Sequence, residues 1–63
     1  MHIVVNGRHR VVHETAPTVQ DVLGDREIQD VRFGGVVLVD GSPAHAGTEI
    51  LDGDTVDVMV GPD

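Results

Sequence analysis

The sequence predicts a small α+β domain over residues 1–63, in which a mixed sheet of four or five strands packs on one short helix. Valine occurs 13 times and Phe33 is the only aromatic residue, a composition that favours strands and a core of small β-branched side chains. Short apolar segments alternate with turn signals that contain glycine, and one segment spaces its apolar residues with a helical period. The predicted order of elements is ββαββ(β).

The first 13 residues predict a β-hairpin. Asn6-Gly7 separates two segments, and both residues tolerate the positive φ angles of a tight hairpin turn. A plain two-residue turn would place Arg10 beside Ile3 on the buried face. A one-residue bulge around Gly7 instead groups Val11 with Ile3 and turns Arg10 outward, so we expect the bulged register.

A short helix is expected to begin at Thr18. Threonine is a favourable N-cap, and Asp21 lies in the first turn, where a carboxylate interacts well with the helix dipole. A single apolar stripe at spacing i, i+3, i+4 consists of Val19, Val22 and Leu23. Gly24-Asp25 is expected to end the helix after less than two turns. Residues 26–30 are expected either to add a helical turn or to place Ile28 in the core.

Beyond the helix the pattern again predicts strands. Val31–Phe33 and Val36–Val39 flank Gly34-Gly35, and two apolar segments separated by such a pair are expected to form a tight hairpin. A turn cluster follows at residues 40–43, and residues 44–47 are expected to be irregular.

The last part of the chain predicts one buried turn and a final strand. Residues 48–51 form a single turn that is expected to bury Ile50 and Leu51. A reversal at Asp52-Gly53 then leads into a strand over residues 55–60, in which valines alternate with other residues.

The charge balance excludes several classes of partner. Four arginines, no lysine and 11 acidic residues give a formal net charge of −7. Nucleic acids and anionic membranes favour clustered basic side chains, so neither is expected as a partner. No apolar run approaches the roughly 20 residues of a membrane span. The absence of cysteine excludes disulfide bonds, a thiolate metal site and a cysteine nucleophile.

No group of residues predicts catalysis, a metal site or a bound cofactor. The only serine, Ser42, has no base suggested by the sequence, and the chain lacks lysine, tyrosine and cysteine. His9 and His13 would lie about 13 Å apart on one strand, too far to share a metal ion. The aspartates at residues 52–57 lack the full loop of a calcium site and are expected to form turns. We therefore expect a protein that is not an enzyme.

Four segments, in this order, resemble the small sulfur carriers of thiamine and molybdopterin synthesis. These carriers are the ThiS/MoaD-like family of ubiquitin-like β-grasp proteins. The segments are residues 3–7 (IVVNG), 18–23 (TVQDVL), 31–35 (VRFGG) and 50–56 (ILDGDTV). The resemblance covers nearly the whole chain and implies a β-grasp fold, in which a mixed sheet curls around one helix.

The resemblance also implies a chemistry at the C-terminus. In that family the terminal carboxylate of a Gly-Gly tail enters a narrow channel, becomes an acyl-adenylate and accepts sulfur as a thiocarboxylate. This chain instead ends in Val60-Gly61-Pro62-Asp63. Pro62 restricts φ next to Gly61, and Asp63 adds bulk and charge near the reacting carboxylate. Carrier activity would therefore require trimming to Gly61 and an adenylating enzyme as partner.

A protein-binding surface is expected on the open face of the sheet. In the bulged register this face carries Val4, Arg10, Val12, Asp57 and Met59. Three of them, Val4, Val12 and Met59, would form an apolar patch of the kind that marks protein–protein contacts.

Together, these patterns favour a non-catalytic β-grasp module that docks on a larger protein complex. It would be an accessory subunit or a minor structural component, including one of a viral particle. One alternative is a sulfur carrier that forms a thiocarboxylate at Gly61. Another is a pH- or metal-responsive binder that uses the histidines. The expected location is the cytoplasm, or a virion or other assembly.

Overall fold

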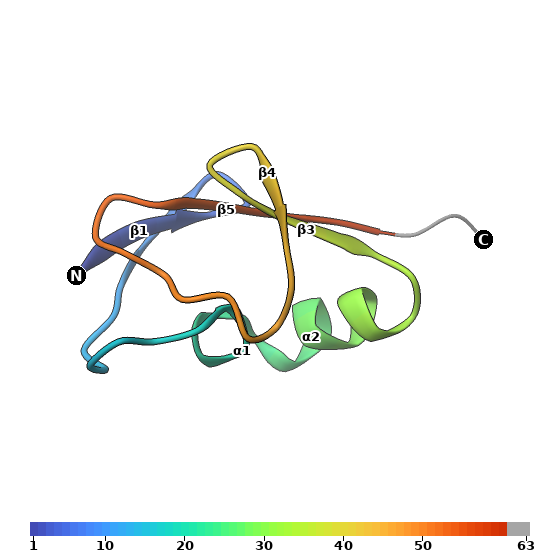
Figure 1. The fold of residues 1–63 in the computed structure, drawn as a ribbon, viewed down its shortest axis with the longest axis horizontal. Coiled ribbons are helices and arrows are strands. Elements are labelled where there is room, and N and C mark those ends of the chain that lie inside the picture. The colour runs from blue at the N-terminus through green and yellow to red at the C-terminus, as the bar shows by residue number, and fades with distance from the viewer. Residues whose placement is uncertain (61–63) are drawn as a thin grey trace.

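The computed structural model describes residues 1–60 and shows a five-stranded sheet with two short helices against one face (Figure 1). The strands lie in the order β2-β1-β5-β3-β4; β1 and β5 are parallel, and the other neighbouring pairs are antiparallel. The predicted α+β class is confirmed, with one more helix than expected. The elements are β1 (His2–Val5), β2 (Arg8–Val11), α1 (Val19–Val22), α2 (Asp25–Arg32), β3 (Val36–Val39), β4 (Ser42–Ala44) and β5 (Thr55–Met59).

The first hairpin, between β1 and β2, has a plain two-residue turn. Asn6 and Gly7 have φ angles of 50° and 80°, and two positive angles in succession are typical of a type I′ turn. Ile3 therefore pairs with Arg10. The predicted bulged register is wrong, because a type I′ turn already matches the twist of the two strands without an extra residue. Val11 consequently points away from the core and is 56% exposed.

The helix α1 follows Thr18 as predicted. The Asp21 carboxylate accepts hydrogen bonds from the backbone N–H of Thr18 at 2.8 Å and from its hydroxyl at 2.9 Å. The backbone bond, followed by the hydroxyl bond, lowers the pKa of Asp21. These hydrogen bonds between Thr18 and Asp21 hold the first turn of a helix that is too short to be stable alone.

A second helix, α2, covers the segment around Ile28, where an added helical turn was one expectation, and extends into the first two residues of the strand expected over 31–33. Ile28 and Val31 pack against the core from this helix. Gly34 has φ 96°, and the N–H of Gly35 donates to the carbonyl oxygen of Asp30 at 2.8 Å. Such a contact closes the C-terminus of a helix. The predicted strand over residues 31–33 is therefore wrong, because the two glycines end a helix here and do not connect two strands.

The second hairpin joins β3 to β4 through Asp40-Gly41. These residues have φ angles of 51° and 82°, and Val39 pairs with Ser42. Residues 42–44, which were expected to be turn and irregular chain, thus form an edge strand. Pro43 is tolerated there because one side of an edge strand needs no donor.

The core lies between the inner sheet face and the helices. Val5 and Val56, on the paired strands β1 and β5, are 0% exposed. Ile50 is buried as predicted, but Leu51 is 61% exposed, because the Asp54 carboxylate accepts its N–H at 2.8 Å in the turn that leads to β5. The buried hydrophobic residues are Ile3, Val5, Val12, Val19, Val22, Leu23, Val37, Ile50 and Val56.

Replacing Gly35 with Ala is expected to destabilise the fold more than replacing Gly34. A Cβ on Gly35 would lie 2.7 Å from the carbonyl oxygen of Met59 and closer still to that of Asp30. Overpacking between two backbones should cost about 2–3 kcal/mol. A Cβ on Gly34 meets nothing within 4 Å, so its positive φ should cost only about 1 kcal/mol. Urea unfolding measures both losses, and equal losses would contradict the predicted clash.

Candidate functional site

The outer face of the sheet, opposite the helices, is not covered by any other part of residues 1–60 (Figure 1). Alternate residues of each strand point to it, because successive side chains in a strand lie on opposite faces. Val36 of β3 and Met59 of β5 pair across two of its strands and are 50% and 57% exposed. The outer face consists of His2, Val4, His9, Val11, Val36, Leu38, Pro43, Thr55, Asp57 and Met59.

Three of the five predicted partner-contact residues share this face, namely Val4, Asp57 and Met59. Their role in binding stays a prediction. The expected outward positions of Arg10 and Val12 are wrong, because they depended on the bulged register. Val12 belongs to the core and is 8% exposed, and Arg10 lies on the helix side of the sheet.

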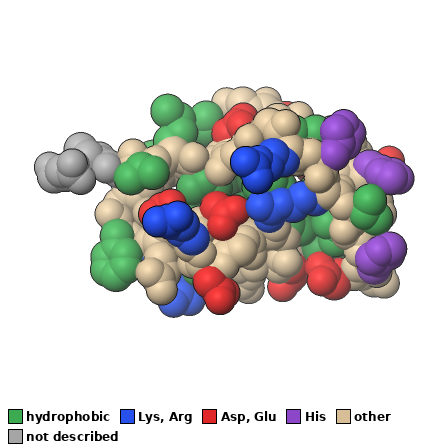
Figure 2. All heavy atoms as spheres, turned by 180° about the vertical axis from the view of Figure 1, so that it is seen from behind, with side chains coloured by type: hydrophobic (Ala, Val, Ile, Leu, Met, Phe, Trp, Pro, Cys, Tyr) green, Lys and Arg blue, Asp and Glu red, His purple; other side chains and the backbone are tan. Residues whose placement is uncertain are grey.

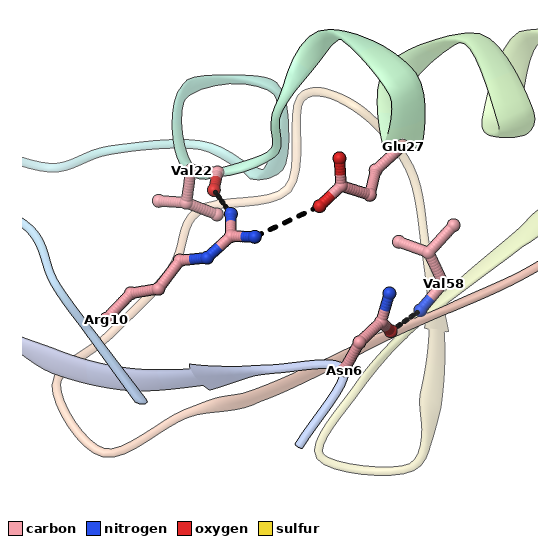
Figure 3. Close-up of polar contacts among 5 residues, drawn as sticks. All are labelled: Asn6, Arg10, Val22, Glu27 and Val58. Carbon is pink, nitrogen blue, oxygen red and sulfur yellow. Dashed lines mark hydrogen bonds and ion pairs between the residues drawn. The ribbon is translucent and has the colours of Figure 1, made fainter. Parts of the chain in front are cut away.

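Arg10 connects the edge strand β2 to both helices (Figure 3). Its Nη1 donates to the carbonyl oxygen of Val22 at 3.0 Å, and its Nη2 forms an ion pair with Glu27 Oε1 at 3.0 Å. Val22 is the last residue of α1, where carbonyl groups lack helical partners. The guanidinium supplies such a partner and explains how an arginine can share a sheet face with Ile3.

β5 continues past the last residue of β1, and hydrogen bonds still hold its end on both sides. The side-chain oxygen of Asn6 accepts the N–H of Val58 at 2.8 Å (Figure 3), in place of the strand partner that β1 no longer provides. Val60 follows β5 and is 74% exposed. The expected reactive position Gly61, with Pro62 and Asp63, lies outside the described residues.

Aspartates in two of the turns accept hydrogen bonds from backbone N–H groups. Asp52 accepts the N–H of His2 at 2.7 Å, and Asp40 accepts that of Thr55 at 2.8 Å.

Within residues 1–60, no three histidine or acidic side chains are placed to hold a metal ion, and the surface has no pocket. In the same range no helix has the length and apolar character needed to cross a membrane.

The whole chain matches the crystal structure of the thiamine biosynthesis protein ThiS from Geobacter metallireducens, with a TM-score of 0.74. The chain has the fold of ThiS. The match covers 100% of this chain and 97% of ThiS, at 20% sequence identity, and confirms the predicted ThiS/MoaD-like β-grasp fold. No protein-family model matches the sequence, and no curated protein matches it significantly.

This match corrects the functional interpretation that the sequence favoured. The sequence favoured a docking module of a larger complex, including a viral particle, because its last residues depart from the Gly-Gly tail of the carriers, whereas the structure that matches the full chain is a thiamine biosynthesis protein. The assembly-module interpretation is therefore wrong, and the match supports the sulfur-carrier alternative better.

Phe33 is a large apolar residue exposed at the end of a helix. It lies at the C-cap of α2, and its side chain is 82% exposed. A basic residue in a last turn followed by glycine is a common signal for the end of a helix. Arg32 and Gly34 carry that signal here and predict the observed position of Phe33.

The Arg10–Glu27 contact predicts how stability depends on pH. A hydrogen bond from its own backbone and one from Arg10 lower the pKa of Glu27. A lowered pKa in the folded state means that ionised Glu27 stabilises the fold at neutral pH, and that this stabilisation is lost as pH falls through that pKa. Glu27→Gln should therefore cost less than about 1 kcal/mol at pH 7, because the pair is partly exposed.

The cost of Glu27→Gln should shrink towards zero when unfolding by urea is repeated at about pH 3. Glu14→Gln removes one charge from an exposed loop and serves as the control. A cost that is equal at both pH values would show that the carboxylate charge makes no contribution.

Proposed function

We propose that this protein is a sulfur carrier that acts through its C-terminal tail. The observation that carries the proposal is the ThiS-like fold of the entire chain, in which the last strand, β5, occupies the centre of the sheet. Hydrogen bonds hold β5 on both sides, and Val60 at its end is exposed. The tail of such a carrier starts from a fixed point that a partner enzyme can locate.

The chemistry follows from the resemblance to ThiS/MoaD-like carriers. The terminal carboxylate attacks the α-phosphorus of ATP, pyrophosphate leaves, and an acyl-adenylate forms. Hydrosulfide then attacks the carbonyl carbon; the new C–S bond replaces the bond to the phosphate oxygen, and AMP leaves. The product is a thiocarboxylate. In this scheme the chain is the substrate of an adenylating enzyme and contributes no catalytic group.

The reactive carboxylate in this proposal is that of Gly61. It becomes available when hydrolysis of the Gly61–Pro62 bond removes the last two residues. Glycine has no side chain to obstruct a narrow channel, whereas a terminal proline and aspartate add a rigid ring and a second carboxylate.

The outer face is the proposed docking surface for the adenylating enzyme. Val4, Asp57 and Met59 of this face lie on the neighbouring strands β1 and β5, and Met59 is separated from the proposed reactive residue by Val60 alone. A partner that contacts Met59 is therefore also close to the residue at which the chemistry takes place.

The carrier proposal predicts that a chain ending at Gly61 is converted to a thiocarboxylate. The chain is incubated with ATP, sulfide and the adenylating enzymes of the organism that produces it, and its intact mass is measured. The expected product has sulfur in place of one carboxylate oxygen. The chain that retains Pro62 and Asp63 is the matched control and should stay unmodified.

Two controls make a negative result informative. Omission of ATP must abolish the product, because hydrosulfide does not displace an unactivated carboxylate oxygen. A ThiS-type carrier from the same organism must be converted under the same conditions. If that carrier reacts while neither form of this chain does, the proposed function is wrong.

Met59→Asp should weaken docking without unfolding the domain. The side chain is 57% exposed, so its loss removes little core packing, while a carboxylate would be placed in an apolar contact. Binding to the adenylating enzyme should fall by about tenfold in titration calorimetry. Leu51→Asp adds the same charge at a residue that is 61% exposed and lies outside the outer face, so it should bind like the unchanged protein.

A further inference from the structure

Phe33 combines an unusual exposure with a fixed position. It is the only aromatic residue of the chain, and its side chain is 82% exposed. Its N–H donates to the carbonyl oxygen of Gln29 at 3.0 Å, and Gly35 closes the helix end through Asp30 two residues later. The backbone that carries the ring is therefore held by α2, so a partner can bind Phe33 with little loss of backbone entropy.

The exposed large apolar side chains are concentrated where β5 ends. Six are exposed in residues 1–60, and four of them, Phe33, Val36, Met59 and Val60, lie at this end of the molecule. Val36 pairs with Met59, and the segment from Phe33 to Val36 passes close to the carbonyl of Met59 at Gly35. Figure 2 shows separate hydrophobic side chains towards this end, which lies at the other end of the view from the histidines. We call these four residues the tail-exit patch.

The shape of the patch differs from that of the outer face alone. Val36 and Met59 belong to the outer face, whereas Phe33 projects from the end of α2, on the side of the sheet that carries the helices. A partner that covers only the sheet would leave the aromatic ring in water. A partner that covers the patch must reach around the end of the sheet, and it then surrounds the point where the tail begins.

The net charge decides between a second copy of the chain and a different protein. Each copy carries a formal charge of −7 and has no lysine. Long-range repulsion between two such copies opposes self-association, whereas a basic surface on another protein is attracted and steered towards the chain. An apolar patch on a domain with this much negative charge fits a partner that has a positively charged surface.

We propose that the tail-exit patch is the docking site for a protein that has a basic surface around an apolar pocket, and that Phe33 fills that pocket. This inference rests on the proposed carrier function and identifies the partner as the enzyme that acts on the tail. Aromatic side chains buried in a partner's pocket commonly dominate binding energy, and the residues around them exclude water. Val36, Met59 and Val60 add exposed apolar area around the end of β5.

Binding of the full 63-residue chain to the adenylating enzymes of its source organism tests the inference. Phe33→Ser should weaken binding by about tenfold in titration calorimetry, and Phe33→Leu should recover part of the loss because it restores apolar volume. Leu51→Ser removes another exposed apolar side chain away from the patch and should change binding by less than about twofold. Raising the salt concentration should weaken binding of the unchanged chain.

The outcomes separate this inference from the carrier function. Phe33→Ser that binds as tightly as the unchanged chain, while the chain ending at Gly61 still forms a thiocarboxylate, overturns the docking role and leaves the carrier function intact. A chain that neither binds the enzyme nor reacts overturns both. Equal weakening by Phe33→Ser and Leu51→Ser also overturns the docking role, because the effect would then not be specific to the patch. The melting temperatures of both variants should match that of the unchanged chain, since both side chains lie outside the core.

Discussion

The parallel pairing of β1 with β5 is the interaction on which the rest of the structure depends. The N–H of Val4 donates to the carbonyl oxygen of Asp54 at 3.0 Å, and that of Asn6 donates to Val56 at 2.9 Å. Without β5 the molecule consists of two separate hairpins, β1–β2 and β3–β4, and an isolated hairpin is at best marginally stable in water. Val5 and Val56 meet at this pairing and are fully buried. The chain therefore builds its core around its last strand.

The features that sequence patterns predicted are those that depend on near neighbours. The turn residues Asn6-Gly7, the helix start at Thr18 and the alternation of β5 all follow from local backbone preference and periodicity. Placing Val4, Asp57 and Met59 on one sheet face required only that alternation.

The features that sequence patterns missed depend on contacts between distant segments. Arg10 tolerates an inward position because its guanidinium reaches a helix carbonyl 12 residues away and a carboxylate 17 residues away. Val31 belongs to a helix because the core receives its side chain from α2, although the local pattern is equally compatible with a strand. The exposure of Phe33 follows from the same difference, since a strand would have carried the ring into the sheet.

The parallel arrangement also determines how the domain responds to mechanical force. β1 begins at one end of the molecule and β5 finishes at the other, and both run in the same direction (Figure 1). Force applied between the start of β1 and the end of β5 acts along the strands, so the hydrogen bonds between them are loaded together in shear and do not open one after another. A pull on the end of β5 while the start of β1 is held therefore loads these hydrogen bonds at the same time. The pairing of the first strand with the last thus resists separation of the two ends of the sheet.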